Sequence, residues 1–472
     1  MKKVDMIVKA PHFYTMEGEG VGYKTGVAMI VNAGKIEDFV DAATVDSEFK
    51  ADEVLDLKEH VIFPGLIDAH MHTLDNVMRG LAQDSNNWMM QALQPFANAA
   101  NAEDTQIGSR VAIIEAVKAG TTCLGDYNTQ IDTSAEFINK IGARGNLAVM
   151  FRAALRKVYM PGELYEFDDD MGEREMQGNI DAYNKWHGNG NIRVLFGPQG
   201  ADFLSPEMLL KAQKAAKERH TKLHVHVQQG DRETYQIVKR YGKRPTQFLS
   251  ELGILDKDLI AVHLTDCNEE ETRVIARSGA GMVVNPASIG IIDGIVCPSL
   301  IFQEEGGMCG LGSDQAPGNN CHNIIHEMKN VCLFNKIKYG NPEIMPAWKA
   351  LRMATIEGAK AIGVDDVCGS LEIGKSADFI AVSLNFPSML PVYTYPMRNM
   401  VPNFVYSARG EEVTHSVVAG KVIMRDRKLT AIDEQEYLDA IKTRPQALGE
   451  RAAKEWFGLD GINNKYMQED KL

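Results

Sequence analysis

Two histidines separated by one residue close an apolar run early in the chain, and this spacing is suited to metal binding. The run begins at Val61 and ends with His70 and His72. In a β-strand, residues i and i+2 point to the same side, so both imidazoles can reach one metal ion. Histidine pairs also occur on strands that bind no metal, and the interpretation therefore depends on further ligands elsewhere in the chain.

Three further polar residues occupy similar places. His226 and His263 lie late in apolar runs, and Asp314 follows the run that ends at Ser313. Imidazoles and a carboxylate suit zinc or a similar divalent ion, and such an ion lowers the pKa of a bound water from about 15.7 toward 7. We therefore expect one divalent metal ion per chain, with zinc favoured and iron, cobalt or manganese as alternatives. The expected ligands are His70, His72, His226 and Asp314.

The carboxylate and the remaining histidine have expected roles in catalysis. Asp314 can also take the proton of the attacking water, and His263 can hydrogen-bond the substrate oxygen or the attacking hydroxide. Competing interpretations are that Asp314 caps a local turn and that His263 is a satisfied core histidine. His224 shares a strand face with His226 but lies one step deeper, so His226 is the favoured ligand.

The elements that must position these residues alternate between apolar strands and amphipathic helices. The eight strand candidates span residues 61–69, 121–125, 147–151, 192–196, 222–227, 259–263, 281–285 and 308–313. Helical stretches lie between most of them, and two have capping signals at Ser205 and at Asn268 with Glu271. This alternation predicts an α/β fold of the TIM barrel type, a (β/α)8 barrel, whose chemistry lies at the C-terminal ends of the strands. The candidate residues lie there, and Asp126 and Gln199 follow two further strands.

Both ends of the chain lie outside this alternation. Residues 1–60 contain short strands and turns that are too few to bury a core unaided, and strands at 378–384 and 414–425 are their expected partners. Residues 433–457 are expected to be helical, with a poorly ordered tail beyond Asn463. The expected domains are a β-module at 1–60, a barrel at 61–365, the second part of the β-module at 366–430, and a helix and tail at 431–472.

Bulk properties exclude several classes of protein. A net charge of -14 argues against a nucleic-acid or anionic-membrane partner, because either needs a concentrated basic face. Asp5 and Lys9 interrupt what would be the apolar stretch of a signal peptide. The seven cysteines are scattered and include no Cys-x-x-Cys pair, which favours a protein of the reducing cytoplasm.

Several motifs, in a fixed order, resemble the amidohydrolase superfamily. They are Phe63-Pro-Gly-Leu-Ile-Asp-Ala-His-Met-His72, Ala116-Val-Lys-Ala-Gly-Thr-Thr122, Gly312-Ser-Asp314, Met353-Ala-Thr-Ile-Glu-Gly-Ala-Lys360 and Gly369-Ser-Leu-Glu-Ile-Gly-Lys-Ser-Ala-Asp378. Within the superfamily the chain is similar to the branch of the s-triazine hydrolases and the S-adenosylhomocysteine deaminases, and also to molinate and phenylurea hydrolases. The resemblance implies a barrel with one metal ion, flanked by a small β-sandwich made from both chain ends. It agrees with the ligands named above.

The chain departs from this branch at positions that matter for the reaction. Where deaminases of the branch carry a glutamate that moves protons, this chain has Gln229, which cannot carry a proton. Gln199 stands where a substrate-binding histidine is common, and Val284 replaces the histidine of a His-Asn-Pro motif. A substrate that needs less acid assistance would suit such a site.

The expected function is hydrolysis of a non-peptide carbon–nitrogen bond in a small molecule. Ureas, carbamates and thiocarbamates are the favoured class, because Gln229 could orient their carbonyl while Asp314 relays a single proton. The alternative is an aminohydrolase or chlorohydrolase of a heteroaromatic ring such as a purine, pyrimidine or s-triazine. A catalytically silent barrel that binds a ligand is the alternative from another class. Gln199 and Trp88 are expected to contact the substrate, although Trp88 could equally be a packing residue, and similar proteins are commonly homo-oligomers.

Overall fold

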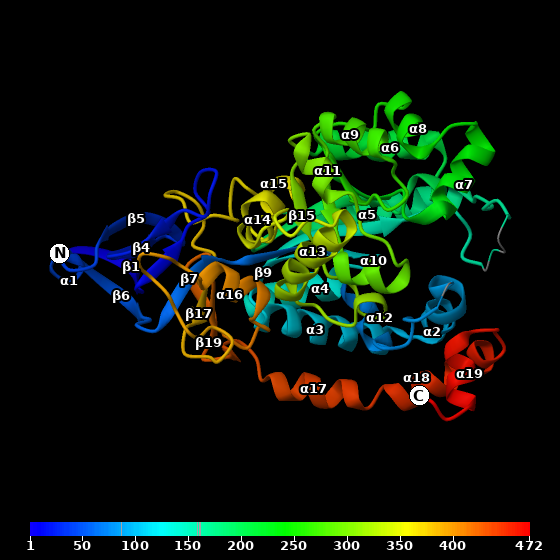
Figure 1. Ribbon diagram of the computed structural model, residues 1–472. Coiled ribbons are helices and arrows are strands. Elements are labelled where there is room, and N and C mark those ends of the chain that lie inside the picture. The colour runs from blue at the N-terminus through cyan, green and yellow to red at the C-terminus, as the bar shows by residue number, and fades with distance from the viewer. Residues whose placement is uncertain (86, 158, 160–161) are drawn as a thin grey trace.

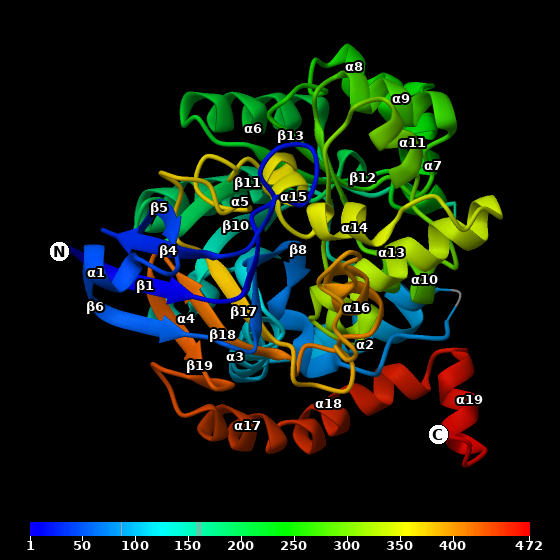
Figure 2. The ribbon, with the colours of Figure 1, turned by 60° about the vertical axis from the view of Figure 1, so that its left-hand side comes forward.

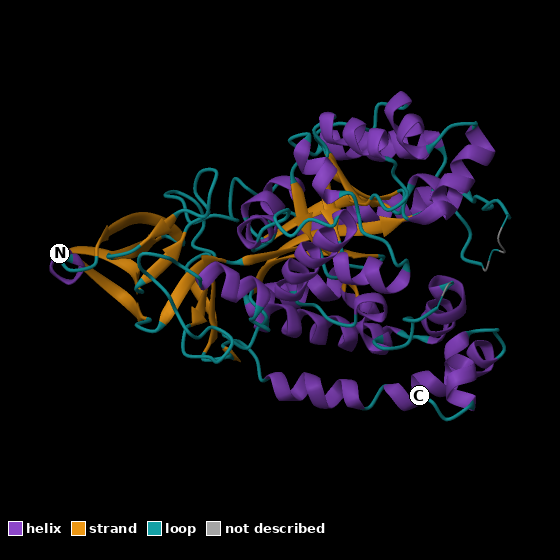
Figure 3. Ribbon diagram, in the orientation of Figure 1, coloured by secondary structure: helices purple, strands orange, loops and turns teal. Residues whose placement is uncertain are grey.

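A barrel with a small β-sandwich on one side makes up the computed structural model (Figures 1 and 3), which describes residues 1–472 except 86, 158, 160 and 161. Strands occupy the centre of the barrel and helices surround them, while the sandwich contains the N-terminus. The barrel strands are β8 (Leu66–His72), β9 (Thr121–Asn128), β10 (Arg144–Phe151), β11 (Ile192–Pro198), β12 (Leu223–Val227), β13 (Leu259–His263), β14 (Gly281–Val284), β15 (Cys309–Leu311) and β16 (Asp314–Gln315).

All neighbouring strands of this sheet are parallel, as the alternation of strands and helices predicted. The eighth strand is interrupted after Leu311. Its first part, β15, pairs with β14, and its second part, β16, pairs with β8 and so joins the two ends of the sheet. The interruption places Asp314 beside Met71, next to the histidine pair.

Helices connect the strands and cover the outside of the barrel (Figure 2). Both capping signals in the sequence are confirmed: Ser205 accepts a hydrogen bond from the amide of Met208, and Asn268 and Glu271 form a capping box. The barrel helices are α3 (Ala102–Lys118), α4 (Asp132–Ile141), α5 (Asp169–Trp186), α6 (Pro206–Glu218), α7 (Gly230–Tyr241), α8 (Pro245–Glu251), α9 (Glu269–Arg277), α10 (Pro286–Ile292), α11 (Ser299–Glu304), α12 (Ala316–Asn319), α13 (Ile324–Tyr339), α14 (Ala347–Met353) and α15 (Ile356–Ile362).

Short helices lie in the connections that follow β8 and β11. Three of them are 3-10 or π-helices, and α2 continues directly from the π-helix. They are the 3-10 helix η1 (Thr73–Met78), the π-helix η2 (Trp88–Leu93), α2 (Gln94–Ala99) and the 3-10 helix η3 (Ala201–Phe203). The helices η1, η2 and α2 all lie between β8 and α3. This is the longest of the connections that follow a barrel strand with expected ligands.

The β-sandwich consists of two sheets that pack through one apolar core. One sheet holds β5 (Lys35–Asp41), β4 (Val27–Asn32), β1 (Lys2–Lys9) and β6 (Phe49–Asp56), with α1 (Val45–Glu48) beside it. The other holds β20 (Lys428–Leu429), β19 (Lys421–Arg425), β18 (Val413–Val418), β17 (Phe379–Ser383), β7 (His60–Pro64), β2 (His12–Tyr14) and β3 (Tyr23–Lys24). Side chains of both sheets, such as Met6, Met29, Phe13 and Phe379, are buried in the shared core.

One expectation about the strands is wrong in detail. The apolar run from Val61 to Ala69 is not one strand: β7 pairs with β17 in the sandwich, and β8 begins only after Gly65. The Pro64-Gly65 pair was the signal for this break, because such a dipeptide marks a turn. The N-terminal strands β1, β4 and β6 hydrogen-bond to one another and pack face to face against the sheet that holds the C-terminal strands, their expected partners.

The C-terminal arm runs along the outside of the barrel (Figure 1). It comprises α17 (Glu434–Lys442), α18 (Pro445–Phe457) and α19 (Ile462–Gln468), whereas α16 (Met400–Tyr406) lies near the sandwich. The tail beyond Asn463, which was expected to be poorly ordered, is helical as far as Gln468. Asn464 holds it to α18 and the following turn by donating hydrogen bonds to the backbone carbonyls of Trp456 and Leu459. Among the described residues, no helix is both long and apolar enough to cross a membrane.

Candidate metal centre

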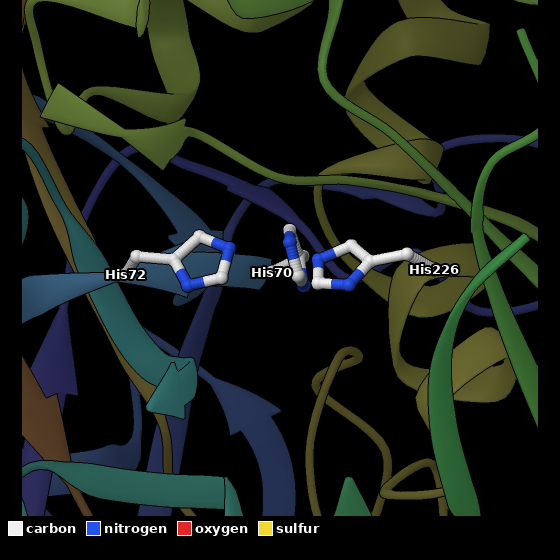
Figure 4. A group of neighbouring side chains, drawn as sticks. All are labelled: His70, His72 and His226. Atoms are coloured by element: carbon white, nitrogen blue, oxygen red, sulfur yellow. The ribbon is translucent and has the colours of Figure 1, made fainter. Parts of the chain in front are cut away.

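Three histidines from two barrel strands converge at the C-terminal end of the barrel. His70 and His72 lie on β8 and His226 lies on β12, and one ring nitrogen of each falls within 4.8 Å of the others. Figure 4 shows the rings of His72 and His226 on either side of His70, which is seen edge-on. The spacing of the His-x-His pair and the late position of His226 in its strand therefore bring these residues together.

Asp314 and His263 complete the cluster. Oδ1 of Asp314 lies 3.7 Å from Nε2 of His70 and 3.5 Å from Nε2 of His72. His70, His263 and Asp314 also form a group whose ligand atoms lie within 4.8 Å of one another. All five side chains named from the sequence for metal binding or for contact with the attacking water thus share one site.

Hydrogen bonds behind the histidines determine which nitrogens face the centre. Nδ1 of His226 donates to the backbone oxygen of Gln199 at 2.7 Å, which leaves Nε2 of His226 free to bind a metal. Nδ1 of His70 lies 2.9 Å from Nε2 of His224. His224 thus supports His70 from behind, in keeping with its deeper position on the strand.

The donor set fits a divalent ion. Nε2 of His70 is buried and has no hydrogen-bond partner among the described residues. A buried polar atom without a partner is costly, and bound metal removes that cost for an imidazole nitrogen. Three imidazoles and one carboxylate with free lone pairs are the ligands of a catalytic zinc site, which keeps a position for water.

Burial keeps the imidazoles of His70, His226 and His263 neutral. Burial, followed by the neighbouring histidines, lowers the pKa of His70 well below its usual value, and the same causes lower the pKa of His226. Burial lowers the pKa of His263 to about 4, although Asp314 opposes the shift. Neutral imidazoles have the lone pairs that a metal needs, so the site is ready for an ion at neutral pH.

Asp314 and His263 are oriented by Ser288 of α10 and by Asn285, which lies between β14 and α10; the sequence analysis gave neither residue a role. Ser288 donates a hydrogen bond from Oγ to Oδ2 of Asp314 at 2.6 Å, which leaves Oδ1 facing the histidines. The amide nitrogen of Asn285 donates to Nδ1 of His263 at 3.1 Å, so Nε2 of His263 carries the proton and can donate it. The signal in the sequence that could have identified Asn285 was the Val284-Asn-Pro286 segment.

The backbone is strained around the centre. His263 and Asp314 both have positive φ, at 80° and 58°, and Gln228 has a φ of 48°. Residues other than glycine rarely adopt this conformation, which persists only when the surroundings enforce it. Here it turns the chain sharply where β12 and β13 end and where β16 begins.

A second buried network fixes the loop that carries Asp314. Asp68 on β8 accepts hydrogen bonds from the amide and the hydroxyl of Ser313, at 3.0 and 2.5 Å. Nδ1 of His322 contacts the same hydroxyl at 2.8 Å. His322 lies in a loop after β16, and no spacing in the sequence connects it to Asp68.

A cavity of about 520 Å³ lies beside the centre. Its walls include Gln229 and Trp88, two residues that the sequence analysis expected near the substrate, together with Arg232 and Asp293. The histidines and Asp314 do not line it, but Gln229 lies three residues after His226 and connects the cavity to β12.

Gln199 has a different position from the one expected. It does not line this cavity, and the amide oxygen of its side chain is buried without a hydrogen-bond partner among the described residues. Its contact with the centre is made by the backbone oxygen that binds His226. The residue therefore orients an expected ligand, and its direct contact with substrate remains only an expectation.

Comparison with known proteins agrees with this geometry. The model of the amidohydrolase family matches residues 61–423. A 5′-deoxyadenosine deaminase from Methanosarcina mazei is 29% identical over 448 residues, which cover 94% of this chain and 98% of that protein. A 5-methylthioadenosine/S-adenosylhomocysteine deaminase from Desulforudis audaxviator is 30% identical over 412 residues, which cover 86% and 91%.

A solved structure has the same fold. The crystal structure of an adenosine deaminase from Xanthomonas campestris with bound zinc superposes with a TM-score of 0.85 and 23% identity, covering 96% of this chain and 99% of that one. These comparisons support the carbon–nitrogen hydrolase expected from the sequence. They do not support the urea, carbamate or thiocarbamate class that was favoured, and they agree better with its alternative, a deaminase.

Proposed function

Because the chain belongs to the amidohydrolase family, we propose that it deaminates an adenine nucleoside that carries no 5′-phosphate. The observation that carries the proposal is the convergence of His70, His72, His226 and Asp314 beside a cavity large enough for a small molecule. The names of the relatives support the substrate class, because 5′-deoxyadenosine, 5-methylthioadenosine and S-adenosylhomocysteine are adenine nucleosides without a phosphate.

The proposed reaction needs an activated water and a place for its proton. We assign the four ligands to one divalent ion, favouring zinc, which when bound makes a water molecule a nucleophile at neutral pH. Asp314 accepts the proton of the attacking water, and the hydroxyl of Ser288 holds its carboxylate in place by donating to Oδ2. Nε2 of His263 donates a hydrogen bond to the oxygen that adds to the substrate carbon.

The cavity walls suit an uncharged purine nucleoside. Trp88 and several tyrosines line the cavity, and aromatic faces can stack on a flat heteroaromatic ring. Asp231 and Asp293 add carboxylates to the same walls, whereas the guanidinium of Arg232 lies 3.5 Å from the buried Asp202. Arg232 is the one cation among the described residues of the cavity wall, and it faces Asp202, so the carboxylates repel a phosphate and a nucleotide is a poor substrate.

One observation favours a second candidate. Gln229 lines the cavity at the position where a deaminase of this branch is expected to have a proton-carrying glutamate. Cleavage of a urea or carbamate would make less demand on such a group. This reaction is the second candidate function.

A substrate panel on zinc-loaded protein tests the proposal. Adenosine, 5′-deoxyadenosine, adenosine 5′-monophosphate, an aryl urea and a thiocarbamate are each incubated with the protein, and ammonia or amine release is measured. We expect ammonia from the two nucleosides and a kcat/KM about 100-fold lower for the monophosphate, because like charges face each other in the cavity. Amine release from the urea or thiocarbamate alone would favour the second candidate, and no turnover with metal bound would indicate a silent barrel.

A further inference from the structure

Hydrolytic deamination of an aminopurine requires proton transfers that the residue at position 229 cannot perform. The ring nitrogen next to the reacting carbon must gain a proton as water adds, and the amine must be protonated before it leaves. An amide side chain such as that of Gln229 donates and accepts hydrogen bonds but does not change its protonation state at neutral pH. A second titratable group, besides Asp314, must therefore face the substrate.

Asp293 is placed to be that group. It directly follows helix α10 (Pro286–Ile292), is half-buried, and lines the same cavity as Gln229. Its carboxylate has no hydrogen bond or ion pair with any other residue that the structure describes. A half-buried carboxylate without a counter-ion is unfavourable, and a position on a cavity wall makes it accessible to a ligand.

Electrostatic interactions link this carboxylate to the cavity and to the centre. Burial raises the pKa of Asp293 to about 6, the charges of Asp314 and Asp231 add to the shift, and Arg232 opposes it. The charge of Arg232 also contributes to lowering the pKa of His263. Asp293 therefore interacts both with Arg232 of the cavity wall and with Asp314 of the centre.

We propose that Asp293 exchanges protons with the ring nitrogen and the oxygen at the reacting carbon, in place of the residue at position 229. This inference rests on the deamination proposed above. It assigns a catalytic role to the residue that directly follows α10, the helix that also supplies the Ser288 that orients Asp314.

The protons balance with two carboxyl groups. Asp293 starts as the acid and gives its proton to the ring nitrogen while a water oxygen bonds to the carbon, and Asp314 takes one proton of that water. Asp314 then passes this proton to the amine. The carbon–nitrogen bond breaks, ammonia leaves, and the remaining hydroxyl proton returns to Asp293 as the carbonyl forms.

Two other carboxyls with a raised pKa do not fit as well. Asp75 interacts electrostatically with His72 and Asp314, but it does not line the cavity. Glu233 is buried and also lies outside the cavity walls, and it accepts a hydrogen bond from the backbone amide of Gln229 at 3.3 Å. Of the three, only Asp293 shares a wall with Gln229.

The test compares Asp293→Asn with the double variant Asp293→Asn/Gln229→Glu on zinc-loaded protein with 5′-deoxyadenosine. We expect Asp293→Asn to lower kcat about 100-fold or more, because general acid–base catalysis contributes at least that factor. The glutamate at position 229 is expected to restore about tenfold or more of kcat, since it supplies a carboxyl at a neighbouring point of the same cavity. In the wild type kcat/KM should fall as the pH rises through the pKa of Asp293, and Asp293→Asn should lack this decrease.

Controls separate this inference from a fault in folding or in the proposed function. Zinc content and melting temperature verify that each variant is folded and loaded with metal. If the wild type releases no ammonia from any nucleoside, the proposed function fails. If the wild type is active and Asp293→Asn keeps its kcat, or if Asp75→Asn shows the loss and rescue instead, the assignment of Asp293 is wrong.

Discussion

At the scale of single residues, the direction of each ring nitrogen is what makes the site suitable for a metal. His226 presents Nε2 because Nδ1 is bound to the oxygen of Gln199, and His70 presents Nε2 because Nδ1 meets His224. Groups behind a ligand commonly change metal affinity by 10 to 100-fold, roughly, when they are removed. A ligand and a residue that supports it should therefore differ in how much metal affinity is lost when each is removed.

Substitutions of the two histidines on β12 test this separation. His226→Ala is expected to remove the metal and the activity together, because it deletes a ligand atom. His224→Ala should keep the metal at high zinc concentration with an affinity lower by about 10 to 100-fold, because only the support of His70 is lost. Zinc titration followed by metal analysis measures both. Equal losses of metal in the two variants would contradict the assignment.

Ser288 offers a second test at this scale. Ser288→Ala removes the hydroxyl that binds Oδ2 of Asp314 at 2.6 Å. A hydrogen bond to a charged group contributes about 1.5–3 kcal/mol, so kcat should fall at least about tenfold while KM changes little. Ser299→Ala on the next helix is the matched control, since that serine is also buried but lies outside the site. A kcat equal to that of the control would show that Asp314 does not depend on this contact.

At the scale of elements, the interruption of the eighth strand positions Asp314 beside the histidine pair. Gly312 and Ser313 separate β15 from β16, and a Cβ at Gly312 would lie 2.3 Å from Oδ1 of Asn285 and 2.6 Å from the backbone oxygen of His70. No side chain fits there without displacing the backbone that carries a ligand. This close approach explains why the Gly-Ser-Asp motif needs its glycine.

Gly312→Ala is accordingly expected to be destabilising. Overpacking in a core costs about 1–3 kcal/mol, and here the contacts are backbone and a buried amide that cannot move freely. We expect a lower melting temperature and a reduced zinc content. Gly178→Ala on α5 is the control, because nothing lies within 4 Å of its added Cβ, and a helical alanine should not destabilise the protein. A Gly312→Ala protein as stable as the control would contradict the packing described here.

Local patterns predicted some elements well and others poorly. Helix boundaries at Ser205 and Asn268 were readable because capping depends on adjacent residues. The end of β7 was marked by Pro64-Gly65, but the apolar pattern does not show that β7 joins the sandwich while β8 joins the barrel. The position of Asp293 was equally unreadable, because α10 brings it to the cavity by tertiary packing alone.

At the scale of the whole molecule, both chain ends hold parts of the barrel in place. Arg144 at the start of β10 donates from Nε to Oδ2 of Asp378 at 2.8 Å, which ties the barrel to the sandwich. On the other side, Trp456 of the C-terminal arm contacts Phe96 of α2, with ring centroids 5.7 Å apart. Helix α2 directly continues η2, whose first residue is Trp88. The arm therefore supports a wall of the cavity.

Trp456→Ala tests whether this support reaches the cavity. Loss of the buried indole should lower stability by roughly 3–5 kcal/mol if the whole cluster unfolds cooperatively, and it should raise KM more than it lowers kcat. Zinc content should be unchanged, because the arm does not touch the ligands. Phe457→Ala is the control, since its side chain is 47% exposed. Unchanged KM together with lower stability would limit the arm to a structural role.

The most direct measurement of the central claim is an anomalous diffraction map of crystals grown from zinc-loaded protein. We expect one strong zinc peak per chain, about 2.0–2.2 Å from Nε2 of His70, His72 and His226 and from Oδ1 of Asp314. A peak at another place, or none in fully loaded and active protein, would contradict the assignment of these four residues as the metal centre.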